Sequence, residues 1–217
     1  MDIEKFATGE THQQAANVLQ YLTPVCKSFM TDMGLEVASN GVQIFGGHGY
    51  VREWGMEQLM RDVKIAQLYE GTNGIQAGDL IGRKLTRSGG VMMRDTHKAL
   101  TALTDVMTDD SARISAQDLL AEWLELSERI MTFTPEDVSG AATDYLFYTS
   151  YVVLGVLWYS MADAAVNTDN AALAAGKVKT RDFYIKRLLP RKDMHKSAIV
   201  SGADDLLAVD DREFDYL

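Results

Sequence analysis

One carboxylate in this sequence stands alone in a turn, where an acid is either a surface charge or a base directed into a pocket. The segment QLYEGTNGIQ, residues 67–76, contains a single acidic side chain, Glu70, directly before Gly71. Gly71 can adopt the left-handed conformation that ends a helix. Asn73, with Gln76 three residues later, supplies a predicted N-cap and N3 partner for the next helix. Glu70 is therefore expected to close one helix just before another begins.

The elements that position this turn are predicted to be helices. Only three prolines occur in 217 residues, and the segments between glycine clusters carry a helical period rather than strict alternation. The turn joins predicted helices over residues 56–70 and 73–87. Ahead of them we predict a helix over residues 11–40, with Pro24 as a kink or break, and a glycine-rich connection over residues 43–55. The predicted fold class is all-α.

A second helical bundle is expected after the Arg-Ser-Gly-Gly motif near residue 89, which divides the chain into residues 1–90 and 91–217. Four further helices are predicted, over residues 92–108, 112–133, 136–167 and 169–189. Residues 145–165 are mostly apolar and of membrane-spanning length. Four tyrosines, Gly155 and Asp163 interrupt them and basic flanks are lacking, which favours a buried core helix and no membrane span.

Charge and composition narrow the function classes. With 21 Lys and Arg against 31 Asp and Glu, the net charge of −10 argues against non-specific nucleic-acid binding and against attraction to anionic membranes. Residues 1–90 are nearly neutral (8 basic, 10 acidic), whereas residues 91–217 are acidic (13 basic, 21 acidic), so an anionic ligand is expected in the first part. One cysteine excludes an intramolecular disulfide, and four scattered histidines lack metal-ligand spacing. Without a secretory leader, the protein is expected to be cytoplasmic.

The motifs around Glu70 are specific to one family. Residues 42–85 contain Gln-x-Phe-Gly-Gly-x-Gly-Tyr, then Met-Arg-Asp, then Tyr-Glu-Gly-Thr followed by Ile-Gln. This ordered set strongly resembles the C-terminal helical region of the acyl-CoA dehydrogenases, which use FAD. Residues 91–217 are similar to the helical extension of the longer members, including those that act on 3-methylthiopropionyl-CoA.

The resemblance also implies what this chain lacks. Such enzymes normally place an N-terminal helical domain, a β-domain and two further helices ahead of the region seen here. We therefore expect the chain to be the C-terminal portion of a longer enzyme, without the substrate pocket and without much of the flavin site. On its own it is expected to be colourless and inactive, and not to retain FAD.

Individual residues acquire roles only through the resemblance. Glu70 would remove the α-proton of an acyl-CoA thioester while the β-hydrogen leaves as hydride to FAD, and a lone acid avoids repulsion of the developing enolate. Tyr69 and Gly71 would line the acyl thioester. The implied flavin contacts are Gln43, Gly46, Gly47, Thr72 and Gly74. The first three would touch the flavin nucleotide of a neighbouring subunit, where glycine lets backbone N–H groups approach a diphosphate.

The implied partners are an acyl-CoA substrate, an electron-transfer flavoprotein as electron acceptor, and a second copy of the chain in at least a dimer. The apolar helix over residues 145–165 must be covered by its own bundle, by residues 11–90 or by a second chain, and we expect association. Three alternatives remain open: an acyl-CoA oxidase, a DNA-binding stress-response flavoprotein with the same helical region, and a non-catalytic helical dimerisation module.

Overall fold

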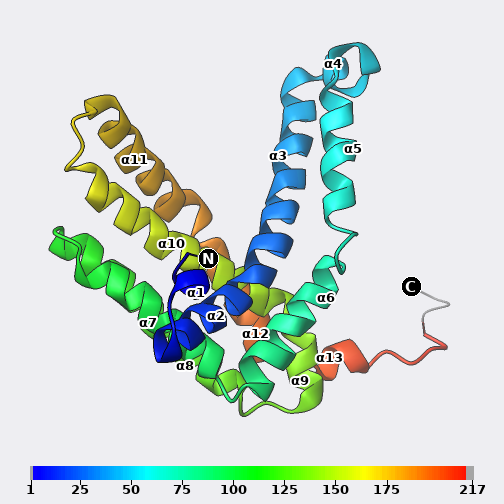
Figure 1. Ribbon diagram of the computed structural model, residues 1–217. Helices are drawn as coiled ribbons and strands as arrows, with labels where there is room; N and C mark the ends of the chain where they lie inside the picture. The colour runs from blue at the N-terminus through cyan, green and yellow to red at the C-terminus, as the bar shows by residue number, and fades with distance from the viewer. Residues whose placement is uncertain (1, 214–217) are drawn as a thin grey trace.

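The protein consists of two helical hairpins that diverge from a shared body. The structure is a computed structural model and describes residues 2–213. Every regular element in that range is a helix, which confirms the predicted all-α class. Figure 1 shows one hairpin of α3 (Met30–Phe45) with α5 (Met56–Ala66), and another of α10 (Ala142–Ala165) with α11 (Ala171–Phe183).

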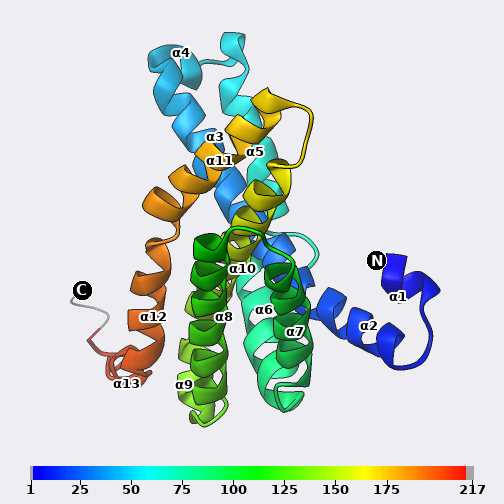
Figure 2. The same cartoon turned by 90° about the vertical axis from the view of Figure 1, so that its left-hand side faces the viewer.

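The other elements form the body, the tip of the α3–α5 hairpin and the chain ends, and Figure 2 shows α7 and α8 side by side in the body. In chain order these elements are α1 (Asp2–Phe6), α2 (Gly9–Pro24), η1 (Val25–Phe29), α4 (Gly47–Tyr50), η2 (Arg52–Trp54), α6 (Asn73–Gly78), η3 (Asp79–Arg87), α7 (Val91–Asp105), α8 (Asp110–Ile130), α9 (Pro135–Gly140), η4 (Tyr184–Leu188), α12 (Arg191–Ser201) and α13 (Asp204–Leu207). η1, η3 and η4 are π-helical, and η2 is a 3₁₀ turn.

The helix predicted over residues 11–40 is longer than expected and does not break at its proline. α2, η1 and α3 follow one another without interruption from Gly9 to Phe45. Pro24 has no N–H for the preceding turn, and the chain continues directly beyond it in π-helical geometry. Gly41, expected near the helix end, lies inside α3. A Cβ there would lie 2.5 Å from the Met56 side chain, so this glycine permits close packing of α3 against α5.

Two other predicted helix boundaries were wrong. The helix expected over residues 56–70 ends at Ala66; Gln67 is its C-cap, and the chain then turns toward the left-handed Glu70 and Gly71. The helix expected over residues 136–167 is divided at Ala141 into α9 and α10. α9 has its own start, since the Thr134 hydroxyl accepts a hydrogen bond from the Asp137 N–H.

α10 is the central helix of the hydrophobic core. It is long and apolar enough to cross a membrane by length and composition, but 61% of its apolar window is buried inside the protein. Its cover includes the first half of the chain: the Phe29 ring packs edge-on at 5.5 Å from Phe147 and 5.1 Å from Tyr151. The structure therefore agrees with the predicted buried core helix, covered by its own chain.

A buried chain of hydrogen bonds also joins the two halves of the molecule. The Tyr21 and Tyr145 hydroxyls lie 2.6 Å apart, and the Tyr145 hydroxyl lies 2.8 Å from Ser127 Oγ. Burial raises the pKa of both phenols, so each stays neutral and can donate a proton. At the surface, Arg191 of α12 forms a two-pronged ion pair with Glu36 of α3, with both N–O distances 3.1 Å. The regions on either side of residue 90 thus share one core.

The carboxylate of Asp163, near the end of α10, holds the loop between α7 and α8. It accepts hydrogen bonds from the backbone N–H groups of Asp109 (2.8 Å) and Thr108 (3.0 Å) and from the Thr108 hydroxyl (3.0 Å). Burial alone would raise the pKa of the Asp163 carboxyl, but these hydrogen bonds to its ionised form outweigh burial and lower the pKa. Ionised Asp163 therefore stabilises the fold.

We expect Asp163→Asn to lower the free energy of unfolding by about 1–2 kcal/mol at pH 7, since it weakens charge-assisted hydrogen bonds. The folded-state pKa lies below the unfolded value of about 3.9, so this stabilisation is present above that pH and is lost as the pH falls through the folded pKa. Urea unfolding at pH 7 and pH 3 should show the gap between wild type and variant shrinking in acid. Asp118→Asn, at an exposed position on α8, is the matched control. An equal gap at both pH values would contradict a role for the charge.

Candidate functional site in the turn between α5 and α6

The turn that contains Glu70 has an unusual backbone. α5 ends at Ala66 and α6 begins at Asn73. Between them, Glu70 (φ 57°) and Gly71 (φ 81°) both adopt positive φ, as predicted for the glycine. Glu70 is the one non-glycine residue with positive φ in residues 2–213. A left-handed conformation costs a residue with a side chain roughly 1–2 kcal/mol, so other contacts must hold the turn.

The cap of α6 is one residue earlier than predicted. Thr72, rather than Asn73, has the extended geometry of an N-cap, and its hydroxyl accepts from the Ile75 N–H at 3.5 Å. Asn73 is already the first helical residue, so its side chain is free to bond elsewhere. Gln76 does not complete a capping box; its side-chain amide donates to the Glu70 carbonyl oxygen at 2.9 Å. The side chains of Asn73 and Gln76 therefore bind other parts of the structure and do not cap α6.

A lysine from η1 binds the same turn. Lys27 Nζ donates to the carbonyl oxygens of Gly71 (2.7 Å) and Gln67 (3.3 Å) and to Asn73 Oδ1 (2.8 Å). Asp32 of α3 accepts from the side-chain amides of Gln67 (2.6 Å) and Asn73 (2.7 Å) through one oxygen. Neither Lys27 nor Asp32 was predicted from the sequence, because no local spacing links them to a turn about 40 residues away.

The predicted site residues of this turn lie together on the surface. Tyr69 is 52% exposed, and Glu70, Gly71, Thr72 and Gly74 are exposed as well. Within residues 2–213 the Glu70 carboxylate has no hydrogen bond or ion pair. The carboxylate is thus available to an incoming group, but the described residues do not enclose it in a pocket.

The predicted nucleotide-contact residues lie at the other end of the same hairpin. Gln43 is in the last turn of α3, Gly46 (φ 60°, ψ −141°) follows α3, and Gly47 opens α4 at the tip (Figure 1). No atom lies within 4 Å of a Cβ placed at Gly46 or Gly47, so the backbone there is open to an approaching group. Gly49, which was not predicted, is required by packing, since a Cβ would collide with the Val42 carbonyl oxygen. The 11 residues of α5, roughly 16 Å of helix, separate the tip from Glu70.

The hairpin exposes many apolar side chains. Tyr50 and Ile44 are 81% and 82% exposed. Others with at least two-fifths of their surface exposed are Val37, Phe45, Val51, Trp54, Leu59, Ile65 and Leu68. A hollow of about 490 Å³ lies between α3 and α5, and its lining includes Leu35, Val42 and Met60. Contiguous apolar surface of this kind is typical of an interaction site.

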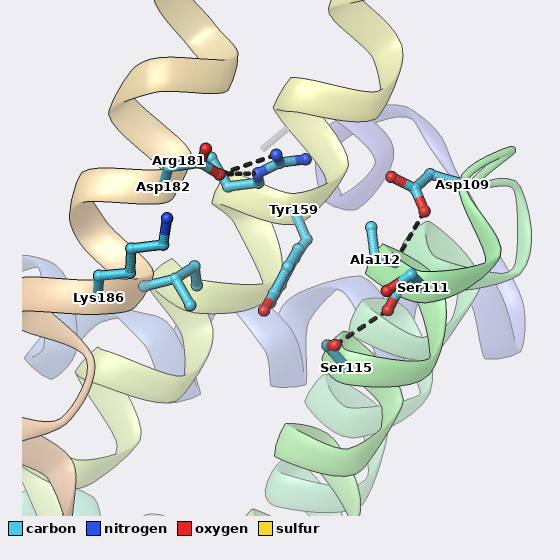
Figure 3. Close-up of a pocket in the computed structure, with 9 residues that line it drawn as sticks. Asp109, Ser111, Ala112, Ser115, Tyr159, Arg181, Asp182 and Lys186 are labelled. Carbon is cyan, nitrogen blue, oxygen red and sulfur yellow. Dashed lines mark hydrogen bonds and ion pairs between the residues drawn. The ribbon is translucent and has the colours of Figure 1, made fainter.

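A separate polar pocket of about 170 Å³ lies between the start of α8, α10 and the end of α11 (Figure 3). Three of its four charged side chains are paired or used in the fold, and the fourth, Lys186, has no hydrogen bond or ion pair within residues 2–213. Arg181 is paired with Asp182 at 2.8 Å, and Asp109 caps α8 by accepting from the Ala112 N–H at 3.1 Å. In residues 2–213 no group of three His, Cys, Asp or Glu side chains is placed to hold a metal ion. This pocket offers no reactive arrangement comparable to the Glu70 turn.

Comparisons with known proteins identify both halves of the chain. Residues 3–85 match the family model described as acyl-CoA dehydrogenase, C-terminal domain. Residues 110–210 match the model described as acetyl-CoA dehydrogenase C-terminal like. A 3-methylmercaptopropionyl-CoA dehydrogenase from Ruegeria pomeroyi is 30% identical over 95% of this chain and 37% of the relative.

The chain belongs to the acyl-CoA dehydrogenase family. Other similar members are a butyryl-CoA dehydrogenase from Syntrophomonas wolfei, 25% identical over 91% of this chain and 35% of the relative, and the broad-specificity linear acyl-CoA dehydrogenase FadE5 from Mycobacterium tuberculosis, 25% identical over 95% and 37%. The chain spans about a third of the length of the curated relatives it matches. The two matched segments leave residues 86–109 between them, which include α7.

We expect Glu70→Gly to stabilise the chain by about 0.5–1 kcal/mol. Glycine adopts positive φ without strain, although its greater freedom in the unfolded state offsets part of the gain. Thermal unfolding of the chain would measure the effect. Arg61→Gly, at an exposed position in the middle of α5, should instead destabilise by about 1 kcal/mol, as glycine does within helices. Equal destabilisation by both variants would show that the Glu70 backbone is not strained.

Proposed function

We propose that this chain is the C-terminal portion of an FAD-dependent acyl-CoA dehydrogenase, and that Glu70 is the base in α,β-dehydrogenation of an acyl-CoA thioester. One observation carries the proposal. The only non-glycine residue with positive φ in residues 2–213 is a glutamate whose backbone is held by side chains while its carboxylate has no partner there. Strain of this kind concentrates at functional sites. The three relatives described above are all acyl-CoA dehydrogenases, which supports the same reaction class.

The chemistry follows from the residue types. The Glu70 carboxylate takes the α-proton of the thioester, and backbone N–H groups beside it stabilise charge that develops on the thioester oxygen. Tyr69 and Gly71 flank the base and line the acyl thioester. When bound, FAD accepts the β-hydrogen as hydride. Closure of the site by groups outside this chain would exclude water from the proton transfer.

The predicted flavin contacts fit a bound nucleotide at the hairpin tip. The backbone at Gly46 and Gly47 is open, since no atom lies within 4 Å of a Cβ at either position, and Gln43 lies one turn away. Thr72 and Gly74 lie beside the base instead. Because the hairpin separates these two groups, we propose that the tip serves the flavin nucleotide of a neighbouring subunit. The isolated chain, with so few of the contacts, is not expected to retain FAD or to turn over substrate.

The proposed partners are an acyl-CoA substrate, an electron-transfer flavoprotein that accepts the electrons, and a second copy of the chain. We propose a cytoplasmic enzyme of acyl-CoA oxidation. Rapid reoxidation of its reduced flavin by air would favour an acyl-CoA oxidase over a dehydrogenase.

In the complete enzyme, Glu70→Gln should retain FAD and bind acyl-CoA. The rate of flavin reduction should fall by about 10²- to 10⁴-fold, the usual contribution of a positioned general base. Glutamine keeps the size of the side chain but cannot take the proton. Stopped-flow absorbance of the flavin after mixing with acyl-CoA measures the rate, and titration with acyl-CoA measures binding. Reduction at the wild-type rate would rule out Glu70 as the base.

We expect the chain to form at least a dimer at micromolar concentration, through the apolar hairpin of α3 and α5. Each buried Leu-sized side chain contributes about 1.5–3 kcal/mol, so several together exceed the entropy cost of association. Size exclusion with light scattering should give a mass at least twice 24.1 kDa. Ile44→Glu should lower the mass, whereas Val166→Glu, 69% exposed at the end of α10, should not. A monomer for the unmodified chain would refute the prediction.

A further inference from the structure

The Glu70 turn is held by a cluster of side chains that lies across α3, η1 and α6. We call Lys27, Asp32, Gln67 and Asn73 the anchor cluster. Lys27 uses three hydrogen bonds, to the Gly71 and Gln67 carbonyl oxygens and to Asn73 Oδ1, at 2.7–3.3 Å. An ammonium has three N–H donors, so all of them are engaged within the described residues. The cation is therefore fixed in place by the turn it binds.

Asp32, the acidic member of the cluster, binds both ends of the turn. Asp32 Oδ1 accepts from the side chain of Gln67, just after α5, and from that of Asn73, the first residue of α6. Asn73 also donates to the Ser28 carbonyl oxygen at 3.2 Å. The Lys27 cation lies at the C-terminal end of α5, where it complements the helix dipole. The start and the end of the six-residue turn are thus tied to the same helical segment.

The strained residue itself is held only through its backbone. Gln76 binds the Glu70 carbonyl oxygen at 2.9 Å, and Lys27 binds the next carbonyl oxygen, that of Gly71, at 2.7 Å. No hydrogen bond or ion pair involves the Glu70 carboxylate within residues 2–213. A cluster that served stability alone would gain more if this position were glycine, because glycine carries no strain there. The arrangement instead fixes the direction in which the glutamate side chain leaves the backbone.

We propose that Lys27, Asp32 and Asn73 are positioning residues for Glu70, which they orient through the backbone of the turn. The inference rests on the proposed function, in which Glu70 is the base. Proton transfer depends on distance and angle, and a displacement of about 1 Å in a reacting group can lower the rate about 10²-fold. Among the three, Lys27 should have the largest effect on the position of Glu70. It binds both Gly71 and Asn73, and it supplies the positive charge of the cluster.

The first experiment measures the turn itself and needs neither FAD nor substrate. Hydrogen exchange of the 217-residue chain should show amides of residues 67–76 exchanging at least tenfold faster in Lys27→Met than in wild type. Lys179→Met is the matched control: Lys179 is an exposed lysine on α11 with no hydrogen bond or ion pair in the part of the chain that the structure describes, and its loss should leave exchange unchanged. If Lys27→Met does not fold, Asn73→Ala removes the link to Asp32 and should give the same local increase. Unchanged exchange in a folded cluster variant would overturn the inference.

The second experiment separates positioning from general stability. In the complete FAD-loaded enzyme, Lys27→Met should lower the rate constant of flavin reduction by about 30- to 100-fold and change the acyl-CoA dissociation constant less than threefold. Lys27→Arg, which keeps the charge, should recover part of the rate, and Lys179→Met should match wild type. A loss of rate matched by an equal loss of binding or of folded protein would overturn the inference.

A double variant distinguishes failure of this inference from failure of the proposed function. In a Glu70→Gln background, Lys27→Met should lower the remaining rate less than threefold, because there is no base left to position. Full additivity of the two losses would overturn the inference while leaving Glu70 as the base. A wild-type rate for Glu70→Gln alone would instead overturn the proposed function, and the exchange experiment would still report whether the cluster holds the turn.

Discussion

The packing of η1 against α10 is the contact on which the candidate site depends. Phe29 packs its ring edge-on against Phe147 and Tyr151, and Val25 is buried in the same core. Lys27 is only partly buried and reaches the opposite way, to the Glu70 turn. Because the core fixes η1, it also fixes the cation that binds the turn. The C-terminal region therefore supports a site to which it contributes no reactive residue.

The strain at Glu70 and the hydrogen bonds around it are comparable in size. A left-handed glutamate costs roughly 1–2 kcal/mol, and each hydrogen bond to a neighbouring carbonyl returns about 0.5–1.5 kcal/mol, more where the donor is charged. Lys27 and Gln76 supply two such bonds to consecutive carbonyls. The turn can thus keep a carboxylate at a position where glycine would be the more stable choice. A side chain retained against local stability is what a functional role would require.

The sequence was a good guide to local features of the site and a poor one to distant contacts. The left-handed Gly71 and the flanking helices were predictable, because glycine and helical periodicity act within a few residues. The N-cap of α6 was predicted at Asn73 but lies at Thr72. Both residue types can cap a helix, and here the Asn73 side chain binds Asp32 instead. Lys27 and Gly71 are 44 positions apart in the sequence, and their contact depends on how the core places η1. No local pattern encodes such a contact.

The two ends of the α3–α5 hairpin carry different groups of predicted site residues. Glu70 and its anchor cluster occupy the end near the body, where the core holds them, whereas Gly46 and Gly47 occupy the free tip with open space around their backbones. A helix length of roughly 16 Å between them is too great for one small reacting group to touch both ends. The apolar surface along the hairpin exposes Ile44 and Tyr50 and calls for cover by another element or chain. The chain thus fixes the backbone of the Glu70 turn, and enclosure of the exposed Glu70 carboxylate would require another element or chain to cover that surface.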